Sequence, residues 1–512
     1  MLQPTRVLAD RPSFRLCVLR PLGNVESPVT CVGSSFTTTY DDPFRLARGY
    51  TAQGCRVRVG VEVSMMKSRT LSVLWMAAVL HWLAAAGVSQ QPAEVAPGLK
   101  VGDVLDQSNA QLAKDLLPPE ILRHYQNGAY RNRIMAYPIG SAHWEKAFRE
   151  ATEKNAGQLD VDARGTIVEK GTGKPPAYNY GIPFPIIDPN DPKAGVKVVW
   201  NQFLAYWQGG SSYNRALVVM LTPKGVDREI IADGWFHFYD GQSPKYRPEN
   251  TMNLQSQFLG VATKPADLQG TASLTWRYRD AEKRDSVWAF VPALRRVRAV
   301  SPANRSDGYL GSDISGDDGF FFDGKPEDFE WKLVGKREGL RIVDPGAVEG
   351  GLKVEPIPGG GWVALTNLNP PTAGFRQPGW TGNAWAPTDA ALAKRPFWVV
   401  EGTPRDKYYL YGRLELWIDA ETWDGAWNRK FSWSGEQIHT YQLTSRVNQQ
   451  AGAADNPEWL PAGTMAWACA ENVKANRATI GGMRPDPTAA FQRRVPLQSS
   501  LFDSMALTRF GK

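Results

Sequence analysis

The sequence predicts an α+β protein made mainly of antiparallel β-structure. Most of the chain after residue 156 consists of short segments rich in aromatic and β-branched residues, and Gly, Pro, Asn or Asp separates these segments. Residues with helical apolar spacing gather instead in the stretch before residue 156. One large antiparallel sheet with a helical cover fits this distribution.

The first region, residues 90–155, is predicted to be helical. Pro118 and Pro119 end the first apolar pattern, and the pair Asn127 and Gly128 ends the second. Helices are expected over 109–117, 120–126 and 144–154.

The second region, residues 156–448, is predicted to form a curved antiparallel sheet. Near its end Leu414, Leu416 and Ile418 alternate with residues of the other face, including Trp417, which is the pattern of a strand with a buried apolar face. We expect the N-terminal helices to cover that face. The expected strands are 196–200, 216–221, 234–239, 274–278, 286–291, 397–400, 408–411, 413–418 and 428–433.

Prolines recur in the third region, residues 449–512. They stand at Pro457, Pro461, Pro485 and Pro487. We expect an irregular tail that packs on the sheet.

Residues 65–89 have the three parts of a secretory signal peptide. A basic start is followed by an apolar run and by small residues that end at Ala86. We expect translation to start at Met65 or Met66, and residues 1–64 to be a wrongly assigned, disordered extension. The mature chain is then expected in the periplasm of a Gram-negative bacterium and not to span a membrane. The competing interpretation is a signal anchor that stays in the bilayer.

The composition excludes several classes of protein. With 42% hydrophobic and 22% charged residues, the chain is globular. The formal net charge of +7 includes the arginine-rich stretch before residue 65, and no run of Lys and Arg with interleaved aromatic residues appears, so no nucleic-acid partner is expected. Cys469 is the only cysteine after residue 64, so we expect no internal disulfide in the mature chain.

Few residues indicate catalysis or metal binding. The calcium-loop pattern fails in an Asp-rich loop, because its Gly and Glu positions hold Asp318 and Gly324. Ser306 as nucleophile and His439 as base are the single catalytic pair of a hydrolase that the sequence allows. We expect no metal, no cofactor and no catalytic residues. The clustered aspartates are Asp307, Asp313, Asp317, Asp318 and Asp323.

The aromatic residues are more informative. The spacing from Trp200 to Trp207 fits one side of a short helix or an irregular strand. An ordinary aromatic core is one interpretation, and a ligand cavity against the sheet is the other. The candidate cavity residues are Trp200, Phe203, Trp207, Trp235, Phe238, Trp276 and Trp288.

Two central segments resemble a known family. SVWAFVPALRRVR (286–298) and NRSDGYLGSDISGDD (304–318) look like the signature of periplasmic outer-membrane lipoprotein-sorting-like proteins, the LolA/LolB-like superfamily. YGIPFP (180–185) is similar to the DUF1329 family within it, and LELWIDAET (414–422) resembles a hairpin of the superfamily. The sequence of residues 316–322, GDDGFFF, differs from that of many relatives in the stretch after the Gly-Ser-Asp triplet. The signature residues are Pro292, Arg295, Arg296, Arg305, Ser306, Asp307, Gly311, Ser312 and Asp313.

The resemblance implies a half-open β-barrel wrapped around helices, with an apolar cavity for acyl chains or another lipid. It implies a non-catalytic periplasmic carrier that moves a hydrophobic ligand, such as a lipoprotein acyl group, between envelope membranes, with inner- or outer-membrane transport proteins as partners. Two alternatives stay open. One is a periplasmic hydrolase that uses the Asp-rich loop or Ser306, and the other is an assembly partner of an outer-membrane protein.

Overall fold

The computed structural model describes residues 93–140, 144–346, 353–365, 373–446, 464–483 and 491–511. The expected signal peptide at 65–89 and the extension at 1–64 lie outside these ranges. Among the helices that the ranges contain, none is both long and apolar enough to cross a membrane.

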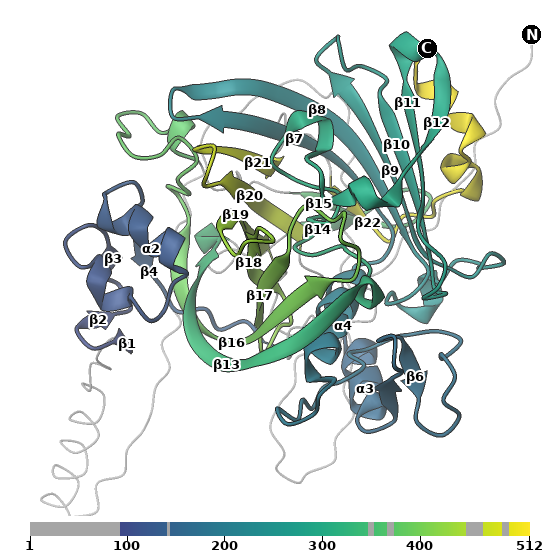
Figure 1. The fold of residues 1–512 in the computed structure, drawn as a ribbon, viewed down its shortest axis with the longest axis horizontal. Coiled ribbons are helices and arrows are strands. Elements are labelled where there is room, and N and C mark those ends of the chain that lie inside the picture. The colour runs from purple at the N-terminus through teal and green to yellow at the C-terminus, as the bar shows by residue number, and fades with distance from the viewer. Residues whose placement is uncertain are drawn as a thin grey trace, which may run out of the picture. The chain divides into compact units, whose positions relative to one another are not determined.

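One large antiparallel sheet dominates the fold, and it curves without closing (Figure 1). In the described ranges the strand at one edge, β12 (Arg296–Val300), pairs only with β11 (Ser286–Val291). The strand at the other edge, β13 (Phe329–Val343), pairs only with β16 (Ala391–Pro404), so the sheet has two free edges. The prediction of a mainly antiparallel, half-open β-barrel is therefore confirmed. From edge to edge the strands are β12 (Arg296–Val300), β11 (Ser286–Val291), β10 (Ala272–Tyr278), β9 (Leu254–Lys264), β8 (Gly225–Phe238), β7 (Ser212–Thr222), β21 (Arg477–Met483), β20 (Thr464–Asn472), β19 (Gln437–Arg446), β18 (Gly425–Phe431), β17 (Arg413–Asp419), β16 (Ala391–Pro404) and β13 (Phe329–Val343).

Short strands extend this sheet or stand beside it. One ladder joins the main sheet at β16, where the added strand runs parallel, and another joins it at β7. The ladder at β16 contains β4 (Asn132–Ile134) and β3 (Val104–Leu105); the ladder at β7 contains β22 (Phe491–Arg493), β15 (Trp362–Leu365) and β14 (Lys353–Pro356). Two separate hairpins are β1 (Glu94–Ala96) with β2 (Leu99–Lys100) and β5 (Leu159–Val161) with β6 (Ile167–Glu169).

Helix α4 (Ala194–Trp207) is buried along almost its whole length and packs on β13 and β16. The strand predicted at 196–200 is therefore wrong. The valines of this segment favour a strand locally, but a helix that is apolar on all sides is stable when a core surrounds it. Gly195 allows the close packing, because a Cβ atom there would lie 2.9 Å from backbone atoms of Lys332 in β13.

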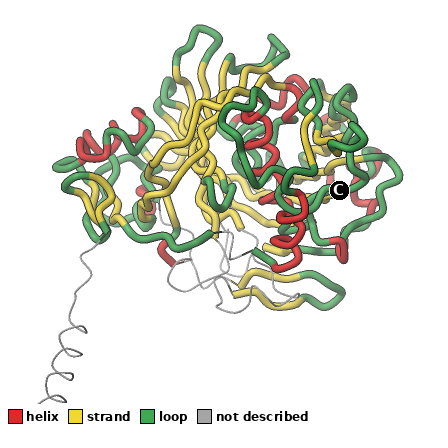
Figure 2. Tube along the Cα trace, turned by 90° about the horizontal axis from the view of Figure 1, so that it is seen from below, coloured by secondary structure: helices red, strands yellow, loops and turns green. Residues whose placement is uncertain are grey.

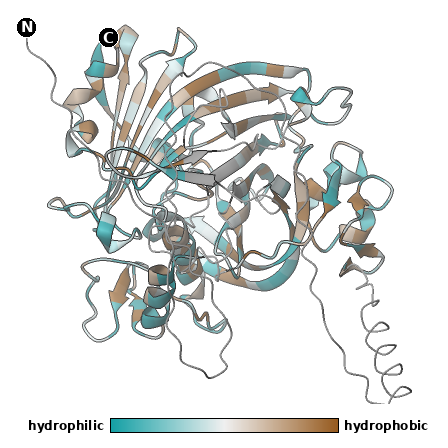
Figure 3. Cartoon of the chain, turned by 180° about the vertical axis from the view of Figure 1, so that it is seen from behind, coloured by the Kyte–Doolittle hydropathy of each residue, from teal (hydrophilic) through white to brown (hydrophobic). Residues whose placement is uncertain are grey.

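The sheet is buried on both faces. Leu414, Leu416 and Ile418 of β17 share a core with α4, and we name this side the inner face. Trp417 points to the outer face, where it joins a core with residues of α2 (Pro119–Gln126). The predicted alternation is confirmed, and apolar and polar bands alternate along the long strands in Figure 3. The expected cover is corrected, because α4, and not an N-terminal helix, covers the leucine face.

The N-terminal region is less helical than predicted, and helices are few throughout the described chain (Figure 2). Helices α2 and α3 (Lys146–Asn155) match two of the three expected helices. Residues 109–117 hold only a short 3-10 turn, η1 (Ala110–Ala113). The strand expected at 408–411 is also absent, because this segment is a loop in which Tyr409 bonds to Asp317 instead of a neighbouring strand.

The expectation of an irregular tail after residue 448 is wrong for β20 and β21, which lie inside the main sheet. Their side chains explain this position: Trp467 and Cys469 join the outer core, whereas Ala468 and Ala470 join the inner core. The four prolines that indicated a tail lie outside the described residues. The end of the region lies on the sheet as a cover, through η10 (Ser499–Phe502) and η11 (Met505–Gly511).

Candidate ligand-binding site

Strands β9 to β12 carry different side chains on their two faces. Leu274, Trp276 and Phe290 point to the outer face, where Phe502 and Leu507 of the C-terminal turns cover them. The alternate residues Ser273, Thr275 and Ala289 point to the inner face. Because these inner side chains are small, they leave a cavity of about 360 Å³. The remaining strand residues of its wall include Ser256, Phe258, Val287, Val291 and Val300.

A loop that follows β12 forms the opposite wall of this cavity. It contains the turns η5 (Pro302–Ser306) and η6 (Tyr309–Gly311), and its residues Asn304, Tyr309 and Leu310 line the cavity. Gly311 has φ +82°, a conformation that favours glycine and that turns the loop back toward the sheet.

Hydrogen bonds fasten the loop on both sides of its cavity-lining stretch. The Ser306 hydroxyl accepts a hydrogen bond of 3.1 Å from the backbone N–H of Leu410. Asp313 accepts one of 3.0 Å from Arg477 of β21, and its own N–H donates to the Thr479 hydroxyl at 2.9 Å. The segment between Ser306 and Asp313 is therefore held at its ends and faces the cavity in its middle.

A buried network of charges closes one end of the cavity. Arg277 of β10 donates to Asp285 at 3.1 Å, and Arg305 lies 3.2 Å from the same carboxylate and donates to Asp317 at 2.5 Å. Burial alone would raise the pKa of Asp285, but the two guanidinium groups hold that pKa below its ordinary value. Asp323 completes the network, because its backbone carbonyl accepts from both arginines at 2.7 Å.

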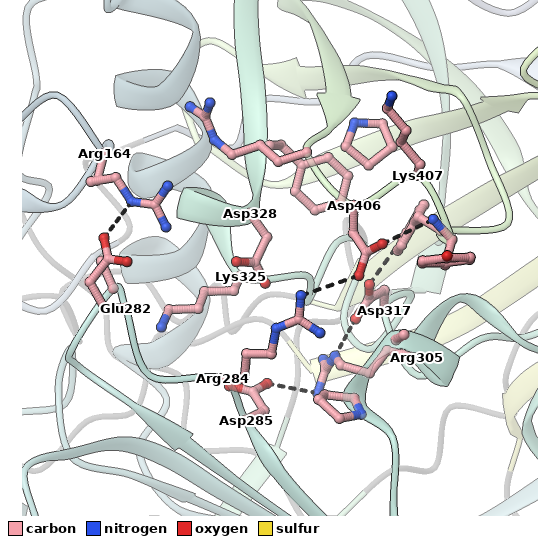
Figure 4. Close-up of a pocket in the computed structure, with 18 residues that line it drawn as sticks. Arg164, Glu282, Arg284, Asp285, Arg305, Asp317, Lys325, Asp328, Asp406 and Lys407 are labelled. Carbon is pink, nitrogen blue, oxygen red and sulfur yellow. Dashed lines mark hydrogen bonds and ion pairs between the residues drawn. The ribbon is translucent and has the colours of Figure 1, made fainter.

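A second cavity, of about 560 Å³, lies on the other side of this network (Figure 4). Arg305 lines both cavities, so the network is their common wall. The second cavity is strongly polar, and much of its charge is paired internally. Its ion pairs are Arg164 with Glu282 at 2.8 Å and Arg284 with Asp406 at 3.6 Å, and the Lys325 ammonium donates to the backbone carbonyls of Asp280 at 2.6 Å and Lys283 at 3.0 Å.

The structure does not bring the seven predicted aromatic residues into one cavity, and none of them lines the apolar one. Trp200, Phe203, Trp207 and Phe238 fill the inner core beside α4. Trp235, Trp276 and Trp288 lie on the outer face, against the C-terminal turns. The expectation of a shared aromatic cavity is therefore corrected: large rings fill space, and the space on this sheet is left by Ser, Thr and Ala. The alternation of small and large residues in β10 and β11 is the signal that could have located it.

The signature residues separate into three groups. Pro292 and Arg295 form the turn between β11 and β12, and Arg296 starts β12. Arg305 and Asp307 line the apolar cavity. The other members, Ser306, Gly311, Ser312 and Asp313, shape and fasten the loop, and Ser306, Ser312 and Asp313 are buried.

The structure does not bring Ser306 and His439 together as a catalytic pair. Among the described residues, no hydrogen bond joins Ser306 to His439. Burial, with Lys430 and Arg477 nearby, lowers the pKa of His439 to about 3. Four of the five clustered aspartates, Asp313, Asp317, Asp318 and Asp323, are engaged in ion pairs. Asp318, for example, binds Lys430 and accepts from the Ser315 N–H at 2.7 Å. In the described part of the chain, no three metal-ligating side chains form a candidate site.

Comparison with known proteins places the chain in a family. Residues 104–508 match the family described as protein of unknown function (DUF1329). The chain belongs to the DUF1329 family. This membership confirms the family resemblance of the sequence. The DUF1329 chain is also 28% identical over 240 residues to the uncharacterized protein PA3922 of Pseudomonas aeruginosa, in a match that spans 45% of this chain and about half, 48%, of that relative.

Solved structures are similar to part of this DUF1329 chain. A putative outer membrane lipoprotein-sorting protein domain from Vibrio parahaemolyticus is similar over 62% of the chain and 100% of its own length, with 14% identity and a TM-score of 0.41. A DUF1329 family protein from Desulfovibrio piger covers 62% of the chain and 99% of itself, with 17% identity and a TM-score of 0.41. A LolA superfamily protein from Nitrosomonas europaea covers 59% and 95%, with 12% identity and a TM-score of 0.33.

Proposed function

We propose that this protein is a non-catalytic carrier that holds a hydrophobic ligand in the apolar cavity between β9 to β12 and the loop of residues 304–316. The ligand class is a lipid or another molecule with an alkyl chain. The carrier acts in the periplasm and moves its ligand between the envelope membranes. Transport proteins of the inner or outer membrane are its expected donors and acceptors, and the role of an assembly partner for an outer-membrane protein stays an untested alternative.

The apolar cavity is the observation that supports this proposal. Its volume of about 360 Å³ lies in the range of roughly 300–1,000 Å³ that small-molecule sites occupy. Its wall combines Val287, Val291 and Val300 with small side chains, and the buried ion pairs of Arg277 and Arg305 close one end. Each buried methylene contributes about 0.8 kcal/mol, so a chain of about ten methylenes supplies about 8 kcal/mol before the entropy of binding is subtracted.

The loop supports the same interpretation. It is fastened by Ser306 and Asp313, while Tyr309 and Leu310 between these anchors face the cavity. A cover that is fixed at two points and presents Tyr309 and Leu310 between them shields a bound chain from water. None of these contacts requires a reacting group.

The first experiment is a ligand search on the purified chain. Extraction with organic solvent followed by mass spectrometry is expected to recover a lipid in stoichiometric amount. Purified protein stripped of lipid is expected to bind N-phenyl-1-naphthylamine, a neutral apolar fluorophore, with a rise in fluorescence. A chain that yields no lipid and binds no fluorophore contradicts the carrier function.

A pair of variants locates the binding. Ala289 of β11 lines the cavity, whereas Ala299 of β12 is exposed and pairs with Trp288 on the outer face. Ala289→Phe fills the cavity and is expected to weaken fluorophore binding about tenfold or more. Ala299→Phe adds the same ring on the other face and is expected to leave binding within about twofold. Equal binding by the two variants contradicts the proposed site.

A further inference from the structure

The side chains of Arg296 and Arg298 of β12 project from the face of the sheet that forms the cavity wall. In the antiparallel ladder Arg296 is opposite Val291, and Arg298 is opposite Ala289. Directly opposed residues of an antiparallel pair place their side chains on the same face of the sheet. Val291 and Ala289 both line the apolar cavity, so the two guanidinium groups stand beside it, on the free edge strand.

These arginines carry charge that no carboxylate of the described ranges neutralises. Both are exposed, and within the described ranges no ion pair or hydrogen bond engages either side chain. The arginines at the closed end of the cavity are already paired, since Arg277 and Arg305 contact the carboxylates of Asp285, Asp317 and Asp323. Arg296 and Arg298 therefore add a local surplus of positive charge at the cavity's edge.

Polarity changes along the cavity in one direction. One end is closed by the network around Arg277 and Arg305, and valines and small side chains line the middle. The opposite end lies at Thr271 and Val291, and Val291 is 37% exposed. A chain that enters at this end passes Arg296 first.

We propose that the carried molecule is an amphiphile with an anionic head, a carboxylate or a phosphate. Its chain lies in the apolar cavity, and its head binds Arg296 and Arg298. The planar guanidinium group donates two parallel hydrogen bonds to either kind of anion, so a pair of arginines suits this head better than a neutral hydroxyl. The inference rests on the proposed carrier function and adds the chemical class of the ligand.

Competition between ligands that differ only in the head tests this inference. Dodecanoate, dodecyl phosphate and dodecanol are titrated separately against the full chain loaded with N-phenyl-1-naphthylamine. The wild type is expected to release the fluorophore at about tenfold lower concentrations of an anionic ligand than of dodecanol. The stronger of the two anions identifies the source of the head, and the preference is expected to shrink at high salt because the arginines are exposed.

Variants connect the preference to the two side chains. The double variant R296Q/R298Q is expected to lose the preference by weakening the anions only, with dodecanol unchanged within about twofold. Arg295→Gln is the matched control, because Arg295 sits in the adjacent turn outside the ladder, so no residue of the cavity wall is paired opposite it. It is expected to keep the preference.

The outcomes separate the inference from the carrier function. Equal release by the anions and by dodecanol in the wild type overturns the anionic head and leaves the carrier standing. So does a preference that survives in R296Q/R298Q, or one that Arg295→Gln removes equally, since diffuse charge would then explain it. A wild type that binds no fluorophore and none of the three ligands overturns both.

Discussion

The guanidinium of Arg305 lies 3.2 Å from the carboxylate of Asp285, and this buried pair stands between an apolar cavity and a polar one. The side chain of Asp285 is only 4% exposed, and Arg277 contacts the same carboxylate. The pair therefore fixes the end of the cavity in which we place the ligand.

Replacing Asp285 is expected to be strongly destabilising. Asp285→Asn leaves Arg277 and Arg305 buried with less compensating charge, and breaking such a pair costs about 3–5 kcal/mol. The exposed pair Arg284 and Asp406 offers the control, because Arg284→Ala is expected to cost less than about 1 kcal/mol. Urea unfolding at pH 7 measures both values. Similar values for the two variants would show that the network contributes little.

Glu327 is expected to make stability fall as the pH rises. Its side chain is buried, Thr166 donates to one carboxylate oxygen at 3.4 Å, and the other oxygen has no partner among the described residues. Burial raises the pKa of Glu327 to about 7. The pKa of Glu327 is higher in the folded state than in the unfolded state. Its contribution to the free energy of unfolding is therefore fully present below about pH 4.5 and is lost as the pH rises through about 7.

Glu327→Gln removes this titration. The variant is expected to be more stable than the wild type at pH 8, by an amount on the order of 3 kcal/mol, and the difference is expected to shrink at pH 5. Urea unfolding at the two pH values measures it. Glu330→Gln is the control, because Glu330 is exposed and pairs with Arg405. A Glu327→Gln effect that does not change with pH would disagree with the raised pKa.

Phe502 is expected to hold the C-terminal turns on the outer face. Its side chain is fully buried against β9 to β11, and its backbone carbonyl accepts a hydrogen bond of 2.9 Å from Trp276. Phe502→Ala removes a buried ring and is expected to cost about 3–5 kcal/mol of unfolding free energy. Met505→Ala, at a side chain that is 74% exposed, is expected to change it by less than about 0.5 kcal/mol. If denaturant melts give equal midpoints for the two variants, the contact is not a stabilising one.

Gly195 is expected to tolerate no side chain. A Cβ atom there meets the backbone of Trp331 and Lys332 at 2.9 Å, so Gly195→Ala forces α4 away from β13 at a cost of about 1–3 kcal/mol. Gly171→Ala provides the comparison, because a Cβ atom there would meet nothing within 4 Å. Thermal unfolding of the two variants measures the difference. A Gly195→Ala variant as stable as Gly171→Ala would mean that the helix and the strand separate easily.

Local patterns predicted the strands of the sheet better than its cores. The alternation of Leu414, Leu416 and Ile418 located the inner face correctly, because a strand with one apolar side leaves that mark in the sequence. The valines of 196–200 misled the prediction, since a helix surrounded by core needs no polar side and therefore shows no helical period. No strand was predicted around Trp467 and Cys469, because the prolines on both sides of this segment indicate irregular structure.

The cavity was missed for a different reason. Aromatic side chains fill space, and Trp276 and Trp288 do so against the C-terminal turns. The cavity exists because Ser273, Thr275 and Ala289 are small, and none of these residues alone indicates a cavity in the sequence. Their meaning depends on the loop at 304–316 that lies opposite them, and no local pattern reveals that proximity.

The hydrogen bond between Trp276 and Phe502 joins positions 226 residues apart. Strands β9 to β11 can form their hairpins early, since their partners are neighbours in the chain, but the contact with the C-terminal turns joins residues far apart in the sequence. Until that contact forms, a row of leucine, tryptophan and phenylalanine side chains faces water. Before the C-terminal turns dock, this outer face, away from the cavity, is therefore an apolar surface at which unfinished chains could associate.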